Sequence, residues 1–195
     1  MTGDETAAPR VDGAMRMTPR TAYLPADQRA RAAVDRALPI GHGQTCSQPT
    51  TVRNMLLALD VQPGQRVLDL GAGSGWTTAI LARLVGPSGS VLGVERVPAL
   101  AAWGAAHVAA AGLPWATIVR AAPGVLGAPA QGPFDRILVS AEARTVPEAL
   151  VAQLDEGGVM VAPVAGELLR IRYDARTVER LGRYLFVPLV EDPGP

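Results

Sequence analysis

Three alternate glycines and an acidic residue share one short stretch of this chain, and this combination can bind a nucleoside ligand. The stretch is Val67-Leu68-Asp69-Leu70-Gly71-Ala72-Gly73-Ser74-Gly75-Trp76. Its apolar start is typical of a strand buried on both faces, and from Thr77 the apolar residues recur at helical spacing. A strand, a glycine turn and a helix open a nucleotide-binding unit, because glycine lets a ligand approach the main chain and the helix start presents free N–H groups.

The glycine spacing argues against a dinucleotide ligand. The G-x-G-x-x-G pattern would place its third glycine at the position of Trp76. Asp69 lies inside the end of the strand, where an acid would meet an amine-bearing ligand better than a pyrophosphate. Glu95 ends the next apolar run, 20 residues after Gly75, and a carboxylate at about this separation reaches ribose hydroxyls. These features together favour an adenosine-containing ligand over the alternative, a tight turn with two incidental acids.

A second group of polar side chains precedes this stretch, in Leu38-Pro39-Ile40-Gly41-His42-Gly43-Gln44-Thr45-Cys46-Ser47-Gln48-Pro49. Its glycines, prolines and small polar residues predict a loop rather than a regular element. The length and the polar groups fit a binding loop, and they also fit a surface loop of ordinary polarity. Composition leaves both alternatives open.

The overall composition limits the class of protein. A chain of 195 residues that is 48% hydrophobic can bury one core and suits one domain. All 18 positive residues are Arg and they are scattered, so no basic patch predicts a nucleic-acid partner. Cys46 is the single cysteine, which excludes an intrachain disulfide and fits a reducing compartment. Because no apolar stretch has the length of a membrane span and no signal-peptide core opens the chain, we expect a cytoplasmic protein without a membrane partner.

Alternating strand and helix patterns must position these groups. Helical spacing follows Pro49, Thr77, Pro98 and Val146, the last over residues 146–154. The predicted strands are 67–70, 90–94, 117–120, 134–140, 159–164, 168–173 and 185–189. This order predicts an α/β fold with a doubly wound, mostly parallel sheet, and the last two strands predict an antiparallel hairpin at its C-terminal edge. We expect residues 1–17 to form a flexible tail, since they lack periodicity, and residues 18–195 to form a single domain.

Several further motifs accompany the polar segment 38–49 and the glycine stretch. They are Pro19-Arg20, Tyr23-Leu24-Pro25, Phe134-Asp135-Arg136-Ile137-Leu138-Val139, Val146-Pro147-Glu148-Ala149-Leu150, Leu154 to Gly158, Pro163-Val164 and Phe186-Val187-Pro188-Leu189. On these residues the chain resembles the protein-L-isoaspartate O-methyltransferase family from about residue 18 to 192. The segment before the first sheet strand is peculiar to this family among methyltransferases, so the match is specific. The resemblance implies the Rossmann-like fold of class I AdoMet-dependent methyltransferases.

The resemblance also implies a reaction and a set of site residues. The methyl donor is S-adenosyl-L-methionine, which leaves as S-adenosyl-L-homocysteine, and the acceptor is an L-isoaspartyl carboxylate in a damaged protein or peptide. Ser47 corresponds to the active-site serine, and no metal is implied. The implied substrate-binding residues are Thr45, Pro163 and Val164, and the implied cofactor-binding residues are Asp69, Gly71, Gly73, Gly75, Glu95, Pro123 and Gly124.

Methyl transfer to a carboxylate needs positioning more than it needs a base, because the carboxylate is already nucleophilic at neutral pH. A short hydroxyl such as that of Ser47 can orient the carboxylate by hydrogen bonding. The alternative is that Ser47 only shapes the loop by bonding to nearby main chain. His42 and His107 are not needed as bases, and we interpret both as structural residues.

Three features depart from the family pattern. Ala122-Pro123-Gly124 replaces a Gly-Asp-Gly run whose Asp reaches the adenine amino group, so adenine recognition must rest on main chain or on another residue. Glu142 and Arg144 place a charge pair where a wall near the substrate is expected, and the first helix of the family is largely missing. Two alternatives therefore stay open: a carboxylate on a dedicated biosynthetic peptide as acceptor, and a catalytically idle relative that binds AdoMet.

Overall fold

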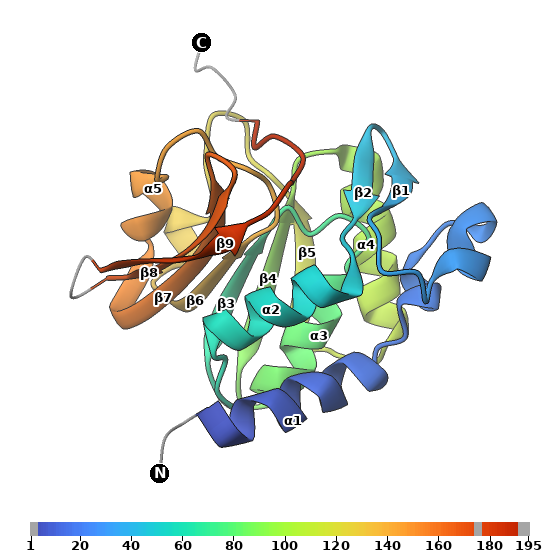
Figure 1. Ribbon diagram of the computed structural model, residues 1–195, viewed down its shortest axis with the longest axis horizontal. Coiled ribbons are helices and arrows are strands. Elements are labelled where there is room, and N and C mark those ends of the chain that lie inside the picture. Colours follow the sequence, from blue (N-terminus) through green and yellow to red (C-terminus); the bar gives the residue numbers. More distant parts are fainter. Residues whose placement is uncertain (1–3, 174–176, 191–195) are drawn as a thin grey trace.

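A seven-stranded sheet forms the centre of the molecule, whose computed structural model describes residues 4–173 and 177–190 (Figure 1). The strand order is β5-β4-β3-β6-β7-β8-β9. All pairs from β5 to β7 are parallel, whereas β7 with β8 and β8 with β9 are antiparallel. The strands are β3 Arg66–Leu70, β4 Ser90–Glu95, β5 Ala116–Arg120, β6 Phe134–Val139, β7 Leu154–Val164, β8 Glu167–Arg172 and β9 Val178–Arg183. The predicted α/β fold with a mostly parallel sheet and an antiparallel hairpin at its C-terminal edge is confirmed.

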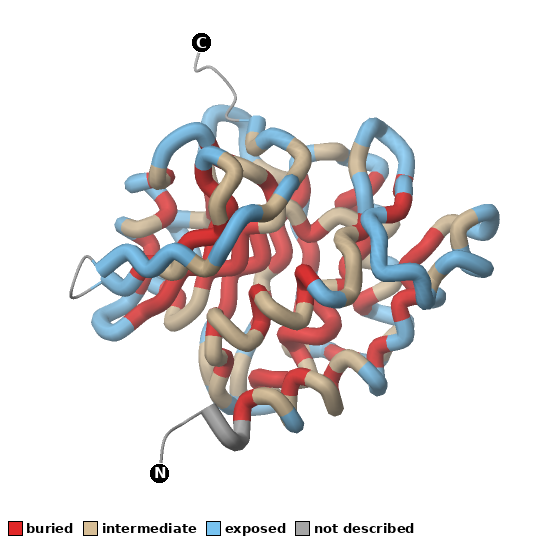
Figure 2. Tube along the Cα trace, viewed as in Figure 1, coloured by how far each residue is buried: buried red, intermediate tan, exposed pale blue. Residues whose placement is uncertain are grey.

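Along the inner strands of the sheet, alternate residues belong to two different cores, one on each face. Figure 2 shows the buried residues running along these strands. Leu138 and Val161 belong to the core shared with α1 to α4, and their neighbours Ile137 and Met160 belong to the core shared with α5. The helices are α1 Asp4–Arg16, α2 Pro49–Leu59, α3 Trp76–Val85, α4 Pro98–Ala110 and α5 Glu148–Val151, and the 3-10 helices are η1 Arg20–Tyr23, η2 Ala26–Arg31 and η3 Pro129–Gln131. In the described part of the chain, no helix combines the length and apolarity that a membrane crossing requires.

Residues 4–16 form helix α1, so the predicted flexible tail is wrong for these residues. Ala7, Val11 and Ala14 recur at helical spacing and are buried, and α1 packs on α2 and α3. The sequence did not predict this helix because two of its three buried side chains are small alanines and because Pro9 lies inside it. The expectation that the first helix of the family is largely missing stays a prediction. Residues 1–3 lie outside the described residues, and the single domain over 18–195 stays a prediction.

Within the polar segment 38–49, residues 38–46 form an antiparallel hairpin rather than the predicted irregular loop. Strand β1 Leu38–Gly41 pairs with β2 Gln44–Cys46. Gly41, His42 and Gly43 make the turn with φ angles of 90°, 54° and 70°, which explains the glycines on both sides of the histidine. Helix α2 then begins directly at Pro49, as predicted.

Two predictions near the C-terminus are wrong in position. The partner of β8 is Val178–Arg183, not residues 185–189, and most of its side chains are exposed on both faces, so no apolar alternation marked it. Leu185, which the prediction placed in a strand, is 95% exposed. The predicted helix over 146–154 is reduced to α5, because β7 already begins at Leu154.

The chain changes direction on the sheet between β3 and β6. From β3 it continues to β4 and β5 on one side, and it then returns to add β6 on the other side of β3. The connections that leave the carboxyl ends of β3 and β6 therefore run to opposite sides. Open α/β sheets bind their ligands in the crevice at this switch point.

Substitution of Val11 tests whether α1 belongs to the folded core. Val11→Ala removes two buried methyl groups and should lower the free energy of unfolding by about 1–2 kcal/mol. Arg16→Ala, an exposed change on the same helix, should stay within about 0.5 kcal/mol of the parent. Urea unfolding followed by circular dichroism measures both variants, and equal midpoints for the two would contradict a packed α1.

Candidate functional site

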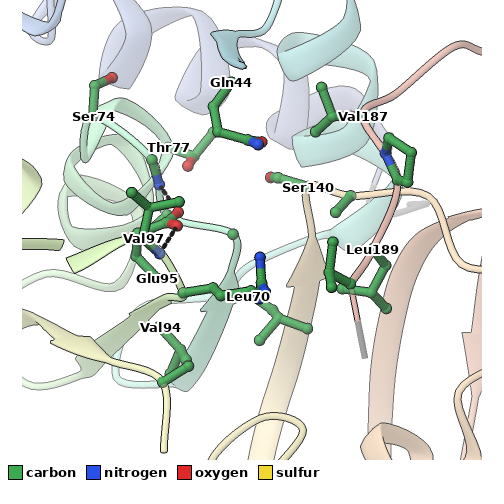
Figure 3. A pocket seen from close by; sticks show the side chains of 18 of the residues that line it. Gln44, Leu70, Ser74, Thr77, Val94, Glu95, Val97, Ser140, Val187 and Leu189 are labelled. Atoms are coloured by element: carbon green, nitrogen blue, oxygen red, sulfur yellow. Dashed lines mark hydrogen bonds between the residues drawn. The ribbon is translucent and has the colours of Figure 1, made fainter. Parts of the chain in front are cut away.

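A cavity of about 310 Å³ opens at the carboxyl ends of β3, β4 and β6, at the switch point of the sheet (Figure 3). Its size lies within the range of small-molecule sites, roughly 300–1,000 Å³. Its walls are the β1–β2 hairpin, the glycine turn after β3, the end of β4, the loop after β5 and the C-terminal segment 187–190. Of the predicted site residues, the structure brings together here Thr45, Ser47, Gly71, Gly73, Glu95 and Gly124. The others, Asp69, Gly75, Pro123, Pro163 and Val164, do not line the cavity.

The glycine turn serves both the cavity and the packing of α4. Gly71 and Gly73 line the cavity with φ angles of 83° and 52°. Gly75 faces α4 instead: a Cβ there would lie 2.8 Å from the Gly104 carbonyl oxygen, and a Cβ at Gly104 would lie 2.7 Å from the Gly73 carbonyl oxygen. The role of Gly75 is therefore indirect, because it lets α4 approach and brace the turn.

Glu95 connects the end of β4 to the glycine turn. Its Oε2 accepts the Gly73 N–H at 2.8 Å, and its Oε1 accepts the Val97 N–H at 2.8 Å (Figure 3). The side chain is buried yet lines the cavity. Since a carboxylate has about four lone-pair positions, both oxygens can still accept hydrogen bonds. Glu95 can thus accept further hydrogen bonds from hydroxyl groups of a ligand in the cavity.

Asp69 lies behind the glycine turn and is fully buried. Its Oδ2 accepts hydrogen bonds from the hydroxyls of Thr77 at 2.7 Å and Thr78 at 2.6 Å, and within the described residues its Oδ1 has no partner. Burial raises the pKa of Asp69 to about 6, against the two threonine hydrogen bonds, which lower it. Asp69 therefore acts on the cavity through Thr77, which lines it, and through its negative charge.

Ser47 lies between the end of β2 and the start of α2. It is half-buried and lines the cavity, as does the exposed Thr45, which pairs with Pro39 in the hairpin. Burial raises the pKa of the Cys46 thiol, which lies between Thr45 and Ser47. The hydrogen bond from Arg20 lowers that pKa by less, so the thiol is neutral at physiological pH. The placement of the segment on a cavity wall favours the binding-loop alternative over an ordinary surface loop.

The loop after β5 forms an apolar wall that contains Gly124 but not Pro123. The buried Gln153 anchors this loop, since its Nε2 donates to the Leu126 carbonyl at 2.9 Å and its Oε1 accepts the Ala128 N–H at 2.8 Å. An adenine ring at this wall would therefore meet main chain and small side chains. No side-chain acceptor from position 123 is available to it.

Pro163 and Val164 lie at the end of β7, outside the cavity. The Pro163 carbonyl accepts the Ala143 N–H at 3.0 Å, and Val164 pairs with Glu167 of β8. The main chain of Pro163 is thus already engaged within the fold. Contacts of both residues with a substrate peptide stay a prediction.

Glu142 positions the C-terminal wall of the cavity. Its N–H donates to the Val187 carbonyl at 2.8 Å and its carbonyl accepts the Leu189 N–H at 2.7 Å. Its carboxylate accepts the Gly166 N–H at 3.1 Å, in the turn between β7 and β8. Arg144 is exposed, and the expectation that Glu142 and Arg144 place a charge pair near the substrate stays a prediction.

Sequence reasoning assigned no role to five polar or charged residues that line the cavity, namely Gln44, Ser74, Thr77, Arg96 and Ser140. Figure 3 labels all of these except Arg96. Ser140 directly follows β6 beside the switch point, and its N–H donates to the Leu70 carbonyl at 2.8 Å. The rule that ligands bind at the carboxyl ends of strands next to a switch point could have identified it. Gln44 and Ser74 lay within the two stretches already singled out.

Comparison with known proteins agrees with this geometry. A family model described as protein-L-isoaspartate(D-aspartate) O-methyltransferase matches residues 4–193. The chain belongs to this family. The matched range includes the residues of α1.

Individual relatives cover almost the whole chain. The protein-L-isoaspartate O-methyltransferase of Aeropyrum pernix is 44% identical over 192 residues, which cover 95% of this chain and 74% of that protein. The enzyme of the same name from Rhodospirillum rubrum is 44% identical over 197 residues, covering 97% and 89%. A crystal structure assigned to the family member of Plasmodium falciparum superposes with a TM-score of 0.80 at 26% identity, covering 93% of this chain and 90% of that one. That structure is a complex with S-adenosyl-L-homocysteine.

Asp69 predicts a pH dependence of stability. Its pKa of about 6 in the folded protein exceeds its ordinary value of 3.8, so between these values the folded state binds a proton that the unfolded state has lost. The free energy of unfolding should therefore fall as the pH rises from about 4 to 6, by an amount on the order of 3 kcal/mol from this group. In Asp69→Asn this contribution should be absent. Thermal melts at about pH 4.5 and 7.5 should show the variant gaining relative to the parent at the higher pH; a constant difference in melting temperature would contradict the assignment.

Proposed function

We propose that this protein transfers the methyl group of S-adenosyl-L-methionine to the carboxylate of L-isoaspartyl residues in proteins or peptides. The observation that carries the proposal is one cavity that is lined both by the glycine turn with Glu95 and by the segment of Ser47. Family membership supports the reaction, and the S-adenosyl-L-homocysteine in the Plasmodium falciparum structure supports the donor. We assign the reaction to the cytoplasm, where the single cysteine stays reduced.

The residues at one end of the cavity fit this donor. Asp69 and Glu95 place two buried carboxylates at that end, which suit a ligand with a sulfonium and an ammonium group. Glu95 can accept hydrogen bonds from ribose hydroxyls, and Gly71 and Gly73 let the ligand approach the main chain closely. The loop that contains Gly124 offers an apolar wall for adenine. The bound donor supplies an electrophilic methyl group on sulfur.

The other end of the cavity can hold the acceptor. Ser47 and Thr45 place two hydroxyls on the wall formed by the hairpin, and each can donate a hydrogen bond to a carboxylate without competing as a base. Correct alignment of the reacting atoms can contribute up to about 7–11 kcal/mol, so orientation is the main task of these residues. We propose that Pro163 and Val164, at the end of β7, contact the peptide on either side of the acceptor.

A pair of peptides tests the proposed reaction. The protein should transfer radiolabelled methyl groups from S-adenosyl-L-methionine to a peptide with one L-isoaspartyl residue, and the twin with normal aspartate should stay unlabelled. The reason is that the isoaspartyl and aspartyl carboxylates lie at different positions relative to the main chain of the peptide. A cavity wall that holds the peptide main chain would therefore align only one of the two carboxylates. Equal labelling of both peptides would contradict isoaspartyl repair and leave a dedicated peptide acceptor, and labelling of neither would favour an idle relative.

Substitution of Ser47 tests the orientation of the acceptor. Ser47→Ala removes a charge-assisted hydrogen bond, so kcat should fall by on the order of ten- to a hundred-fold, or about 1.5–3 kcal/mol, while the affinity for S-adenosyl-L-methionine stays nearly unchanged. Ser90→Ala, at the exposed start of β4, is the matched control and should keep the parent rate. Single-turnover kinetics and thermal melts on the same samples measure both. A folded Ser47→Ala variant with the parent rate would exclude the assigned role.

A further inference from the structure

A buried arginine lies directly beneath the segment that carries Ser47. Arg20 is only 5% exposed. Its guanidinium donates to the carbonyls of Ala32 at 3.3 Å, Val34 at 3.2 Å and Arg36 at 2.8 Å, and to the Cys46 carbonyl at 2.8 Å. Its Nε also contacts the Cys46 sulfur at 3.5 Å. The two segments that Arg20 connects are therefore 32–36 and the end of strand β2.

A second contact ties the same two regions together on the other side of Ser47. The Asp35 Oδ1 accepts the Thr50 N–H at 2.9 Å, in the first turn of α2. Segment 32–36 thus holds the main chain at Cys46, through Arg20, and at Thr50, through Asp35. Ser47 lies in the short span between these two fixed points.

The hydrogen bonds at position 20 require arginine and could not be made by another cationic side chain such as lysine. A buried charge is costly unless its donors are all satisfied, and guanidinium has five N–H donors in a planar fork. Among the described residues, the hydrogen bonds of Arg20 go to main-chain carbonyls and one thiol. The guanidinium also lies 5.5 Å from the centre of the Trp76 ring, which lines the cavity. Lysine has three donors and no plane, so it cannot reach the same set of carbonyls.

We propose that Arg20 and Asp35 are positioning residues that clamp the main chain at residues 46 and 50 and so orient the Ser47 hydroxyl toward the acceptor carboxylate. This inference rests on the proposed function of Ser47. Neither residue lines the cavity, so each acts through the segment that it holds. The hydrogen bonds of the clamp lie at the acceptor end of the cavity, whereas the contact of the guanidinium with the Trp76 ring reaches the residue after the glycine turn.

The first test separates turnover from donor binding. Arg20→Lys should lower kcat for the isoaspartyl peptide by about ten- to a hundred-fold, because a misplacement of about 1 Å is enough for such a loss. Calorimetry should show the affinity for S-adenosyl-L-homocysteine changed by less than about threefold. Arg29→Lys is the matched control, since Arg29 is exposed and its side chain donates to the nearby Leu24 carbonyl. An Arg20→Lys variant with the parent kcat, or with donor affinity lost in proportion to kcat, would overturn the proposal.

The second test uses the exposed point of the clamp, where folding is not at risk. Asp35→Ala should lower kcat by about three- to ten-fold and again spare donor affinity. Asp27→Ala, another exposed aspartate in the neighbouring 3-10 helix, should keep the parent kcat. Equal rates for the two variants would overturn the part of the proposal that concerns Asp35.

The third test needs no enzymatic activity, because the single cysteine reports directly on the clamp. Cys46 is 5% exposed and should react slowly with Ellman's reagent in the folded parent. In Arg20→Lys its rate should rise at least about tenfold under native conditions, since local opening of the segment exposes the thiol. Gln153→Leu removes a buried anchor on the opposite side of the cavity and should leave the rate of Cys46 unchanged.

These thiol rates distinguish a failed clamp from a failed function. If the parent methylates neither peptide, the proposed function is wrong, and the thiol rates still decide whether Arg20 holds the segment. If Arg20→Lys and Gln153→Leu raise the rate equally at equal loss of melting temperature, the effect is global unfolding and the clamp is excluded. A faster thiol only in Arg20→Lys supports it.

Discussion

The close contact between the glycine turn and helix α4 is the constraint on which the site depends. A Cβ at Gly75 or Gly104 would meet main-chain atoms of the other segment at under 3 Å, so the two backbones can approach only because both residues lack side chains. With α4 in this place, Val97 before its first turn reaches Glu95, and Glu95 in turn holds the N–H of Gly73. The turn, the acid and the helix therefore form one rigid support for the donor end of the cavity.

Opposite charges lie behind the two ends of the cavity. Asp69 and Glu95 are buried at the glycine turn, where a cationic donor is expected, and Arg20 is buried beneath the segment of Ser47, where an anionic acceptor is expected. Among the described contacts, these groups bond to main-chain and hydroxyl groups and to the Cys46 thiol, while the Asp69 Oδ1 has no partner. Such fixed dipoles and charges need no rearrangement during methyl transfer, which is the physical advantage of holding them in a dry interior.

Much of the fold and part of the site could be predicted because their signals are local in sequence. The apolar run before Asp69 and the helical spacing after Thr77 identify the first βα unit, and the position of Glu95 places the second strand end in the same crevice. Helix α1 and strand β9 were not predicted because their sequence patterns are weak. The buried face of α1 consists largely of small alanines, and β9 exposes most of its side chains on both faces. Their formation depends on neighbours far away in the chain, such as α2 for α1 and β8 for β9.

The sequence by itself determined the α/β class, the glycine turn with its two acids, and the polar segment around Ser47, since each is written in residues close together in the chain. Only the tertiary structure decided which of these residues line the cavity. It placed Gly75 against α4, Asp69 behind the turn and Pro163 inside the sheet, and it brought Ser140 and Arg20 to the site from distant segments. The physical reason is that burial and hydrogen bonding at these positions are set by packing between elements, and no spacing along one element encodes that packing.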